Sequence, residues 1–270
     1  SALATRAGEG VVSSLQYSLR LQELILGICA VTIGTVILPD LTGFAKNKMW
    51  EEFKNLISQS VKIMALIAIP ITFYALIMSE NIICLIFSGG KFKEESVRMT
   101  MDVFNWHIIG LFFIAVNRIV SPAFYAQKNT KSPTVAGLIN FAVNIALASL
   151  LVTNFGGKGI AFALTTASAV NTIILFAFLS KTKDIQVQDL VKSIVTYSLK
   201  IILLSIAASA SIYFIKDRII AMFEGHSKLI SHGIPVAITG IIFGTAGIIL
   251  LALTKDSVLK AASRKIIKRA

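Results

Sequence analysis

Residues 233–254 read GIPVAITGIIFGTAGIILLALT, and this stretch carries no charged side chain. An apolar segment of about 20 residues has the length that an α-helix needs to cross the hydrocarbon core of a bilayer. Six further apolar stretches of similar length precede it, at residues 14–39, 56–79, 102–126, 134–153, 159–180 and 194–215. The sequence therefore predicts an all-α, polytopic membrane bundle of about seven transmembrane helices.

The composition excludes an ordinary soluble domain. Of the 270 residues, 55% are hydrophobic and 15% are charged, whereas about 25% are charged in a typical soluble domain. Backbone groups inside lipid must pair with one another, which leaves helices or a closed barrel. The apolar runs lack the strict alternation of barrel strands, so helices are favoured. The net charge of +12 lies mostly between the spans and indicates topology and contact with anionic lipid rather than nucleic acid.

The distribution of lysine and arginine predicts the orientation. The loops after the odd-numbered spans, taken with the C-terminal tail, are richer in these residues than the opposite side. Under the positive-inside rule the C-terminus is then cytoplasmic and Ser1 lies outside. The tail decides this prediction through Lys260, Arg264, Lys265, Lys268 and Arg269. The chain begins at Ser1, without the pattern of a signal peptide, which indicates a cut edge.

Three local patterns refine the predicted helices. Residues 80–101 are not a span, because Gly89 and Gly90 form a turn after which a new helix starts at the acidic pair Glu94-Glu95. Pro70 lies inside the second span and predicts a kink, either a hinge or a static bend. In the last two spans, small residues predict a closely packed helical hairpin. They are Ser205, Ala208 and Ser209 with Ile212 on one helix, and Gly240, Gly244 and Gly247 on the other.

Arg20 and Arg118 are placed inside predicted spans. A charge at the centre of a membrane helix costs about 2.5–3.5 kcal/mol on insertion scales, so it usually faces a protein interior or a watery cavity. Arg20 could pair with Glu23 three residues later, or it could bind a phosphate through its planar guanidinium. Arg118 lies nearer the middle of its span and should face the bundle interior, where Asn117 could share its network. Both arginines are candidate anion-binding residues.

Oxygen-bearing side chains suggest one further site. Asn140 and Asn144 are four residues apart and share a helix face, and Thr165 lies in the following span. These three could hold a sodium ion, although such groups also simply form hydrogen bonds between helices. Hydrolase, zinc and nucleotide-binding motifs are absent from the sequence, so an enzyme is not supported. The cysteines, Cys29 and Cys84, and the histidines, His107, His226 and His232, show no metal-binding spacing and are interpreted as structural or interfacial.

Five motifs, in order along the chain, resemble the MurJ (MviN) lipid II flippase family. Residues 9–21 read EGVVSSLQYSLRL, and residues 34–41 read GTVILPDL. The turn SGGKFKEE at 88–95 and the loop AFYAQKNTKSP at 123–133 follow, and GIAFA at 159–163 precedes Asn171. The resemblance is good over residues 9–182, whereas residues 190–270 match the family's last two helices in place and length more than in motif.

The resemblance implies a fold of the multidrug/oligosaccharidyl-lipid/polysaccharide exporter type, with fourteen spans in two six-helix lobes and a final pair. This chain would be the C-terminal half. Residues 1–13 would end a truncated span, 14–182 would form five spans of the C-terminal lobe, and 183–270 would form the final hairpin and basic tail. The implied activity is the flipping of an undecaprenyl-pyrophosphate-linked peptidoglycan precursor, lipid II, across the bacterial cytoplasmic membrane by alternating access, without enzymatic chemistry.

The resemblance also assigns roles to residues. Arg20 falls on a cavity arginine that the family uses for the pyrophosphate, and Arg118 on a position that is often basic. The final helix pair corresponds to a hydrophobic groove for the lipid tail, the N-terminal lobe is missing, and no cofactor is implied beyond coupling to Na⁺ or to the membrane potential. Four residues depart from the family pattern and weaken the ion site and cavity: Pro122, Asn129, Asn144 and Leu164. The alternatives are an exporter of another polyprenyl-linked glycan, a drug/cation antiporter or a non-transporting membrane scaffold.

Overall fold

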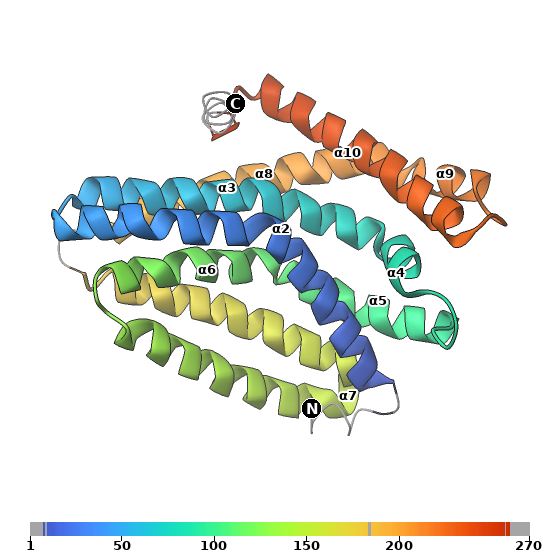
Figure 1. The fold of residues 1–270 in the computed structure, drawn as a ribbon, viewed down its shortest axis with the longest axis horizontal. Helices are drawn as coiled ribbons and strands as arrows, with labels where there is room; N and C mark the ends of the chain where they lie inside the picture. The colour runs from blue at the N-terminus through green and yellow to red at the C-terminus, as the bar shows by residue number, and fades with distance from the viewer. Residues whose placement is uncertain (1–7, 9, 183–184, 257, 260–270) are drawn as a thin grey trace.

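The computed structural model describes residues 8, 10–182, 185–256 and 258–259, and of residues 28–36 only the backbone. In this part of the chain the regular elements are all helical (Figure 1). In chain order they are α2 (Val11–Lys46), α3 (Trp50–Ile77), α4 (Ser79–Phe87), α5 (Glu94–Ile109), α6 (Leu111–Ala126), α7 (Lys131–Leu179), α8 (Val187–Tyr213), α9 (Lys216–Met222), the π-helical turn η1 (Leu229–Gly233) and α10 (Ile234–Leu253).

The predicted membrane bundle is confirmed. Within the described residues, α3, α7, α8 and the η1–α10 segment are long and apolar enough to cross a membrane, and α5 and α6 together qualify as one bent span. The 49-residue α7 contains a non-helical residue, Gly156, with φ 53° and ψ −132°. Figure 1 shows its two arms running back alongside each other. They correspond to the predicted spans 134–153 and 159–180, so α7 supplies two crossings.

The helix α2 differs from its prediction in length. The first span was expected to end at Pro39, but α2 continues through this proline to Lys46. A proline removes one backbone hydrogen bond and bends a helix, yet the turns on either side can remain helical. Figure 1 shows that α2 changes direction along its length. The predicted turn after α4 agrees with the structure, because Gly89 and Gly90 both have positive φ and α5 begins at Glu94.

The third predicted span, 102–126, is broken rather than continuous. The helices α5 and α6 meet at Gly110 with a bend of 43°. Three neighbouring helices donate side-chain hydrogen bonds to consecutive carbonyls just before this bend. Thr165 of α7 binds the carbonyl of Trp106 at 2.7 Å, Gln22 of α2 binds that of His107, and Thr72 of α3 binds that of Ile108 at 3.1 Å. Such bonds satisfy carbonyls that a broken helix would otherwise leave exposed to lipid.

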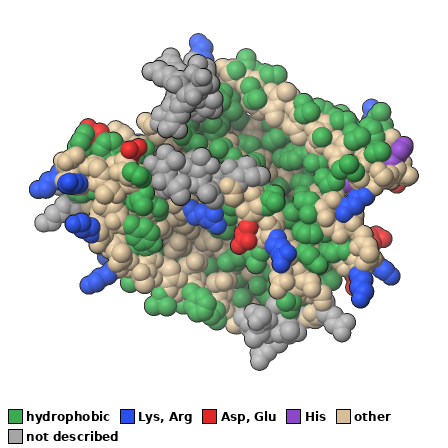
Figure 2. Space-filling view, viewed as in Figure 1, with side chains coloured by type: hydrophobic (Ala, Val, Ile, Leu, Met, Phe, Trp, Pro, Cys, Tyr) green, Lys and Arg blue, Asp and Glu red, His purple; other side chains and the backbone are tan. Residues whose placement is uncertain are grey.

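The core lies where α3 and α6 pack among their neighbours. Large side chains there are completely buried, among them Phe53, Ile57 and Met64 of α3 and Phe124 of α6. The C-terminal ends of α2, α6 and the second arm of α7 lie together at one end of the bundle in Figure 1. Figure 2 shows that many basic side chains on this face lie toward its two ends, with hydrophobic side chains between them.

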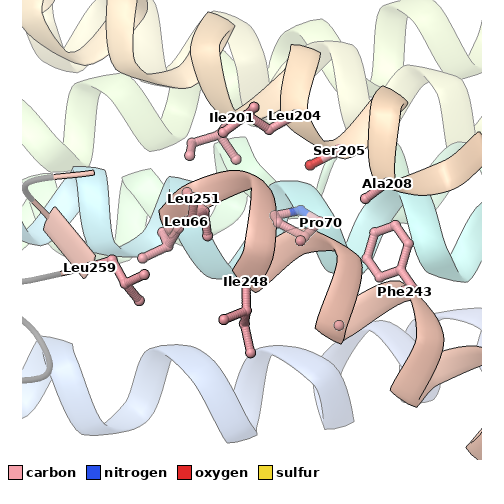
Figure 3. Close-up of a pocket in the computed structure, with 12 residues that line it drawn as sticks. Leu66, Pro70, Ile201, Leu204, Ser205, Ala208, Phe243, Ile248, Leu251 and Leu259 are labelled. Carbon is pink, nitrogen blue, oxygen red and sulfur yellow. The ribbon is translucent and has the colours of Figure 1, made fainter. Parts of the chain in front are cut away.

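The final two long helices pack together, but not as closely as predicted. Ala208 and Ile212 of α8 contact Phe243 of α10. A Cβ added to Gly244 or Gly247 would meet nothing within 4 Å, so these glycines do not mediate a tight contact. They line a groove of about 220 Å³ between α3, α8 and α10 (Figure 3). The prediction of close approach at these two glycines was wrong because α10 also leans on α3, through a hydrogen bond from the Tyr74 hydroxyl to the Val236 carbonyl (2.5 Å).

Several predictions fall outside the described residues. They concern the basic tail, with Lys260, Arg264, Lys265, Lys268 and Arg269, and most of the predicted N-terminal segment 1–13, including Glu9. The side chain of Cys29 is likewise not described, whereas Cys84 is a buried free cysteine.

Candidate substrate-binding site

Arg118 lines a cleft between α6 and both arms of α7. The cleft has a volume of about 450 Å³. Its walls come from Ile114, Asn117, Arg118, Ser121, Pro122 and Tyr125 of α6 and from Asn140, Ser168 and Asn171 of α7. The Arg118 side chain is exposed and forms no ion pair with the described residues. The Arg118 guanidinium therefore faces a polar cleft without a carboxylate partner in the described part of the chain.

Asn117 fixes the wall from which Arg118 projects. Its amide donates to the Ser168 carbonyl at 3.1 Å, and its carbonyl oxygen accepts a hydrogen bond from the Thr172 hydroxyl at 2.8 Å. Asn117 thus joins α6 to α7. Successive side chains on a helix point about 100° apart, so Arg118 is turned away from this contact. Asn117 was predicted to share a hydrogen-bond network with Arg118, but its hydrogen bonds are to Ser168 and Thr172 of α7.

Buried amide oxygens lie in and near the same cleft. The Oδ1 atoms of Asn140, Asn144 and Asn171 are buried and have no hydrogen-bond partner among the described residues. Asn140 and Asn171 line the Arg118 cleft directly. An unpaired buried acceptor is costly, and such atoms are natural ligands for a proton donor or a hard cation. Thr165 does not line this cleft, and its hydroxyl binds the carbonyl of Trp106.

Arg20 lies on a different surface. It is exposed on α2, and neither it nor Glu23 forms an ion pair with a described residue. The opposite side of this helix is held to α5, where the Ser18 hydroxyl lies 2.6 Å from Nδ1 of buried His107. His107 therefore has the structural role expected for it. Arg20 does not line the Arg118 cleft, so the described residues do not bring the two arginines into one pocket.

The sequence-based prediction missed two lysines that lie inside predicted spans. Lys62 lies within the predicted span 56–79 and donates to the Ser193 hydroxyl at 2.6 Å. Lys200 lies within the predicted span 194–215 and pairs with Asp256 at 2.6 Å. Their signal was present in the sequence, because each is a charge inside an apolar run, as Arg20 and Arg118 are.

Comparison with known proteins agrees with the family that the motifs resemble. The family model described as lipid II flippase MurJ matches residues 1–232. The chain belongs to the MurJ family. A probable lipid II flippase MurJ from Treponema pallidum is 44% identical over 266 residues, which cover 98% of this chain and 51% of the relative. A second MurJ relative, from Bdellovibrio bacteriovorus, is 32% identical over 178 residues, 66% of this chain and 34% of the relative.

Solved structures show the same fold. A structure of lipid II flippase MurJ in an inward closed conformation superposes with a TM-score of 0.74 at 20% identity, covering 95% of this chain and 50% of that chain. An inward-facing structure of a multidrug resistance transporter of the MATE family gives a TM-score of 0.54 at 17% identity, covering 97% of this chain and 59% of that chain. The chain thus spans about half the length of the Treponema pallidum relative and of the solved MurJ structure. The family and the apolar helices together indicate a multi-pass protein of the inner membrane.

Proposed function

We propose that this chain forms one half of a lipid II flippase. In this proposal the complete protein carries the undecaprenyl-pyrophosphate-linked peptidoglycan precursor across the inner membrane by alternating access, and no covalent bond is made or broken. Membership of the MurJ family supports the activity. The observation that carries it in the structure is the unpaired guanidinium of Arg118, which faces a polar cleft among membrane-spanning helices.

The chemistry of that cleft suits a pyrophosphate. An arginine presents a rigid, planar set of donors that binds phosphate oxygens in pairs. An unpaired cation inside a membrane protein is costly until an anion approaches it. The amide groups of Asn140 and Asn171 add neutral polar contacts without a competing negative charge. An antiporter for organic cations would instead need acidic side chains in this cleft, and none of its lining residues is acidic.

Arg20 completes the proposed substrate site from another direction. It is exposed on a polar face of α2 that also carries exposed Gln16 and Glu23. A polar face on a membrane helix is stable when it borders protein or water rather than lipid. In the proposal it faces the lobe that the relatives have and this chain does not include, with Arg20 binding pyrophosphate. The groove beside α10, lined mostly by apolar residues, would receive the lipid tail (Figure 3).

The proposed driving force is Na⁺ or the membrane potential. Unpaired oxygen atoms of Asn140 and Asn144 supply two ligands of the type that Na⁺ accepts. Thr165 is the third residue proposed for this site, and it would contribute an oxygen whose proton is already donated to Trp106. Transport that depends on the potential alone, and is unchanged when Na⁺ is replaced by choline, would remove these three residues from the proposal.

The proposed orientation places the C-terminus in the cytoplasm. Residues 1–13 would then lead from an external loop into the bundle of 14–182, followed by the final hairpin and tail, 183–270. The C-terminal ends of α2, α6 and α7 lie together at one end of the bundle, and this supports the arrangement. A reporter enzyme that is active only outside the cytoplasm should be inactive when it is fused after residue 270.

The decisive experiment replaces the two arginines in the full-length gene. Arg20→Ala and Arg118→Gln should each abolish growth of cells that lack any other lipid II flippase, and lipid II should accumulate out of reach of an externally added hydrolase. Arg98→Ala is the matched control, because Arg98 is exposed and pairs with Glu94 on the surface of α5. Normal flipping by both variants, at normal protein levels, would refute the assigned substrate site.

A further inference from the structure

A second cationic site lies between α3 and α8, separate from the Arg118 cleft. It is a crevice of about 420 Å³ that extends along the first half of α8, beside α3. Lys62 enters it from α3, and α8 contributes Lys192 and Lys200. The remaining lining residues are Asp189, Ser193, Thr196 and Tyr197. The crevice shares no residue with the cleft around Arg118.

The positive charge of this crevice is only partly neutralised. Lys200 pairs with buried Asp256, but neither Lys62 nor Lys192 forms an ion pair within the described part of the chain. Lys62 is half-buried, and among the described residues its ammonium donates a hydrogen bond only to the neutral Ser193 hydroxyl. Asp189 lines the crevice without reaching either lysine. A partly desolvated ammonium with no counter-charge attracts an anionic ligand.

The lysines lie where a membrane phosphate would be found. After Lys62, no charged residue occurs in the rest of α3, and after Lys200 none occurs in the rest of α8. Lys200 is hydrogen-bonded to Asp256, which lies just after the end of α10. The end of α10 is therefore at the same height in the bundle as Lys200. From Lys62 to the end of α3 at Ile77 the helix rises about 22 Å, most of the hydrocarbon thickness of a bilayer. Lys62 and Lys200 therefore mark the polar edge of the apolar region.

An apolar surface for lipid chains continues from the crevice. On α8, the side chains of Leu199, Leu203 and Ile206 are 55%, 67% and 51% exposed. Their spacing of four and three residues aligns them in one stripe along the outside of the helix. The stripe begins beside Lys200, at the polar edge of the apolar region, and runs toward the middle of the membrane. A ligand that follows it would carry a charged head and a long hydrocarbon portion.

We propose that Lys62, Lys192 and Lys200 bind the phosphate headgroup of an anionic membrane phospholipid, with its acyl chain lying along the Leu199–Leu203–Ile206 stripe. Ser193 and Thr196 supply hydroxyl groups for the remaining phosphate oxygens. The bound lipid neutralises Lys62 and Lys192 and stabilises the packing of α8 on α3. The site is on the outer surface of this chain, so it does not depend on the substrate carried through the protein.

The test measures lipid retained by the purified, full-length protein in detergent. Mixed micelles are doped with phosphatidylglycerol or with phosphatidylcholine of identical acyl chains, and bound lipid is counted by native mass spectrometry. The double variant Lys62→Gln/Lys192→Gln avoids the Lys200–Asp256 pair. It should lower phosphatidylglycerol retention by more than about tenfold, because each lysine near a membrane surface contributes on the order of a fivefold gain.

Two controls isolate the crevice. Lys46→Gln/Lys48→Gln removes the same charge at the end of α2, near the start of α3, and should leave retention unchanged. Lys62→Arg/Lys192→Arg keeps the charge and should keep the lipid, which separates lost binding from misfolding. Equal losses in both glutamine pairs, or equal retention of the two phospholipids, would overturn the proposal. Displacement by millimolar inorganic phosphate would reassign the crevice to free anions, and preferential retention of undecaprenyl pyrophosphate would reassign it to the substrate. Impaired growth of the Arg118 variant would leave these results unaffected.

Discussion

Replacing Thr165 with valine should destabilise the bend between α5 and α6. Thr165 is buried, and its hydroxyl donates to the Trp106 carbonyl at 2.7 Å. In a regular helix that carbonyl would accept from the N–H of Gly110, but this N–H instead binds the carbonyl of His107 at 3.1 Å. Valine keeps the shape of threonine and removes the donor, so the change isolates one hydrogen bond.

The expected magnitude follows from two limits. An unsatisfied buried carbonyl costs about 1–3 kcal/mol in soluble proteins, whereas polar contacts between membrane helices average about 0.6 kcal/mol and reach about 1.7 kcal/mol. The free energy of unfolding should therefore fall by about 1 kcal/mol. Thr165→Ser, which keeps the hydroxyl, should retain most of the stability.

The assay is equilibrium unfolding of the full-length protein in mixed micelles with increasing denaturing detergent. Thr166→Val is the matched control, because the adjacent threonine forms no side-chain hydrogen bond with another described residue and loses the same atom. If Thr165→Val and Thr166→Val shift the midpoint equally, the carbonyl contacts do not stabilise the bend.

Two further changes test other contacts. Gly159→Ala should destabilise the fold by about 1–3 kcal/mol through overpacking, since the added Cβ would lie 2.7 Å from the Leu151 carbonyl oxygen. Gly137→Ala has open space around it inside α7, and in the same unfolding assay it should be neutral or stabilise the fold by up to about 1 kcal/mol through helix propensity. Burial alone would raise the pKa of Asp256, but hydrogen bonds from Lys200 and the backbone hold that pKa below its ordinary 3.8. The ionised Asp256 carboxylate therefore stabilises the fold above pH 3.8, and this stabilisation is lost as pH falls through the folded-state pKa. Thermal unfolding of Asp256→Asn should therefore lose part of this acid dependence, and an unchanged pH profile would contradict the assignment.

The sequence predicted most of the helices because the length of an apolar run reports directly on a membrane crossing. Residues 233–254 contain α10, and the double glycine before Glu94 separates α4 from α5 as expected. The break at Gly110 was not predicted, because its determinants are side chains on three other helices, including Thr165, which is 59 residues from Trp106 in the chain.

The candidate site was predicted in part. Arg118 was expected to face the bundle interior, and it lines a cleft between helices. Asn117 forms its hydrogen bonds with α7 rather than with Arg118. This choice depends on how α6 and α7 are rotated about their axes, which a single sequence does not specify. Lys62 was missed because it was counted as part of a span, whereas the structure places it at the edge of the apolar region and in contact with α8.

The helix α3 belongs to the bundle core and to the lipid-facing periphery at the same time. Its Phe53 and Met64 are buried among the core helices, while Leu66 and Pro70 form one wall of the groove shared with α8 and α10. Its Lys62 also lines the basic crevice. A change in the tilt of α3 must therefore alter the width of the groove and the spacing of the lysines together. Lipids bound at the outer surface and the conformation of the inner bundle would then respond to each other through a single helix.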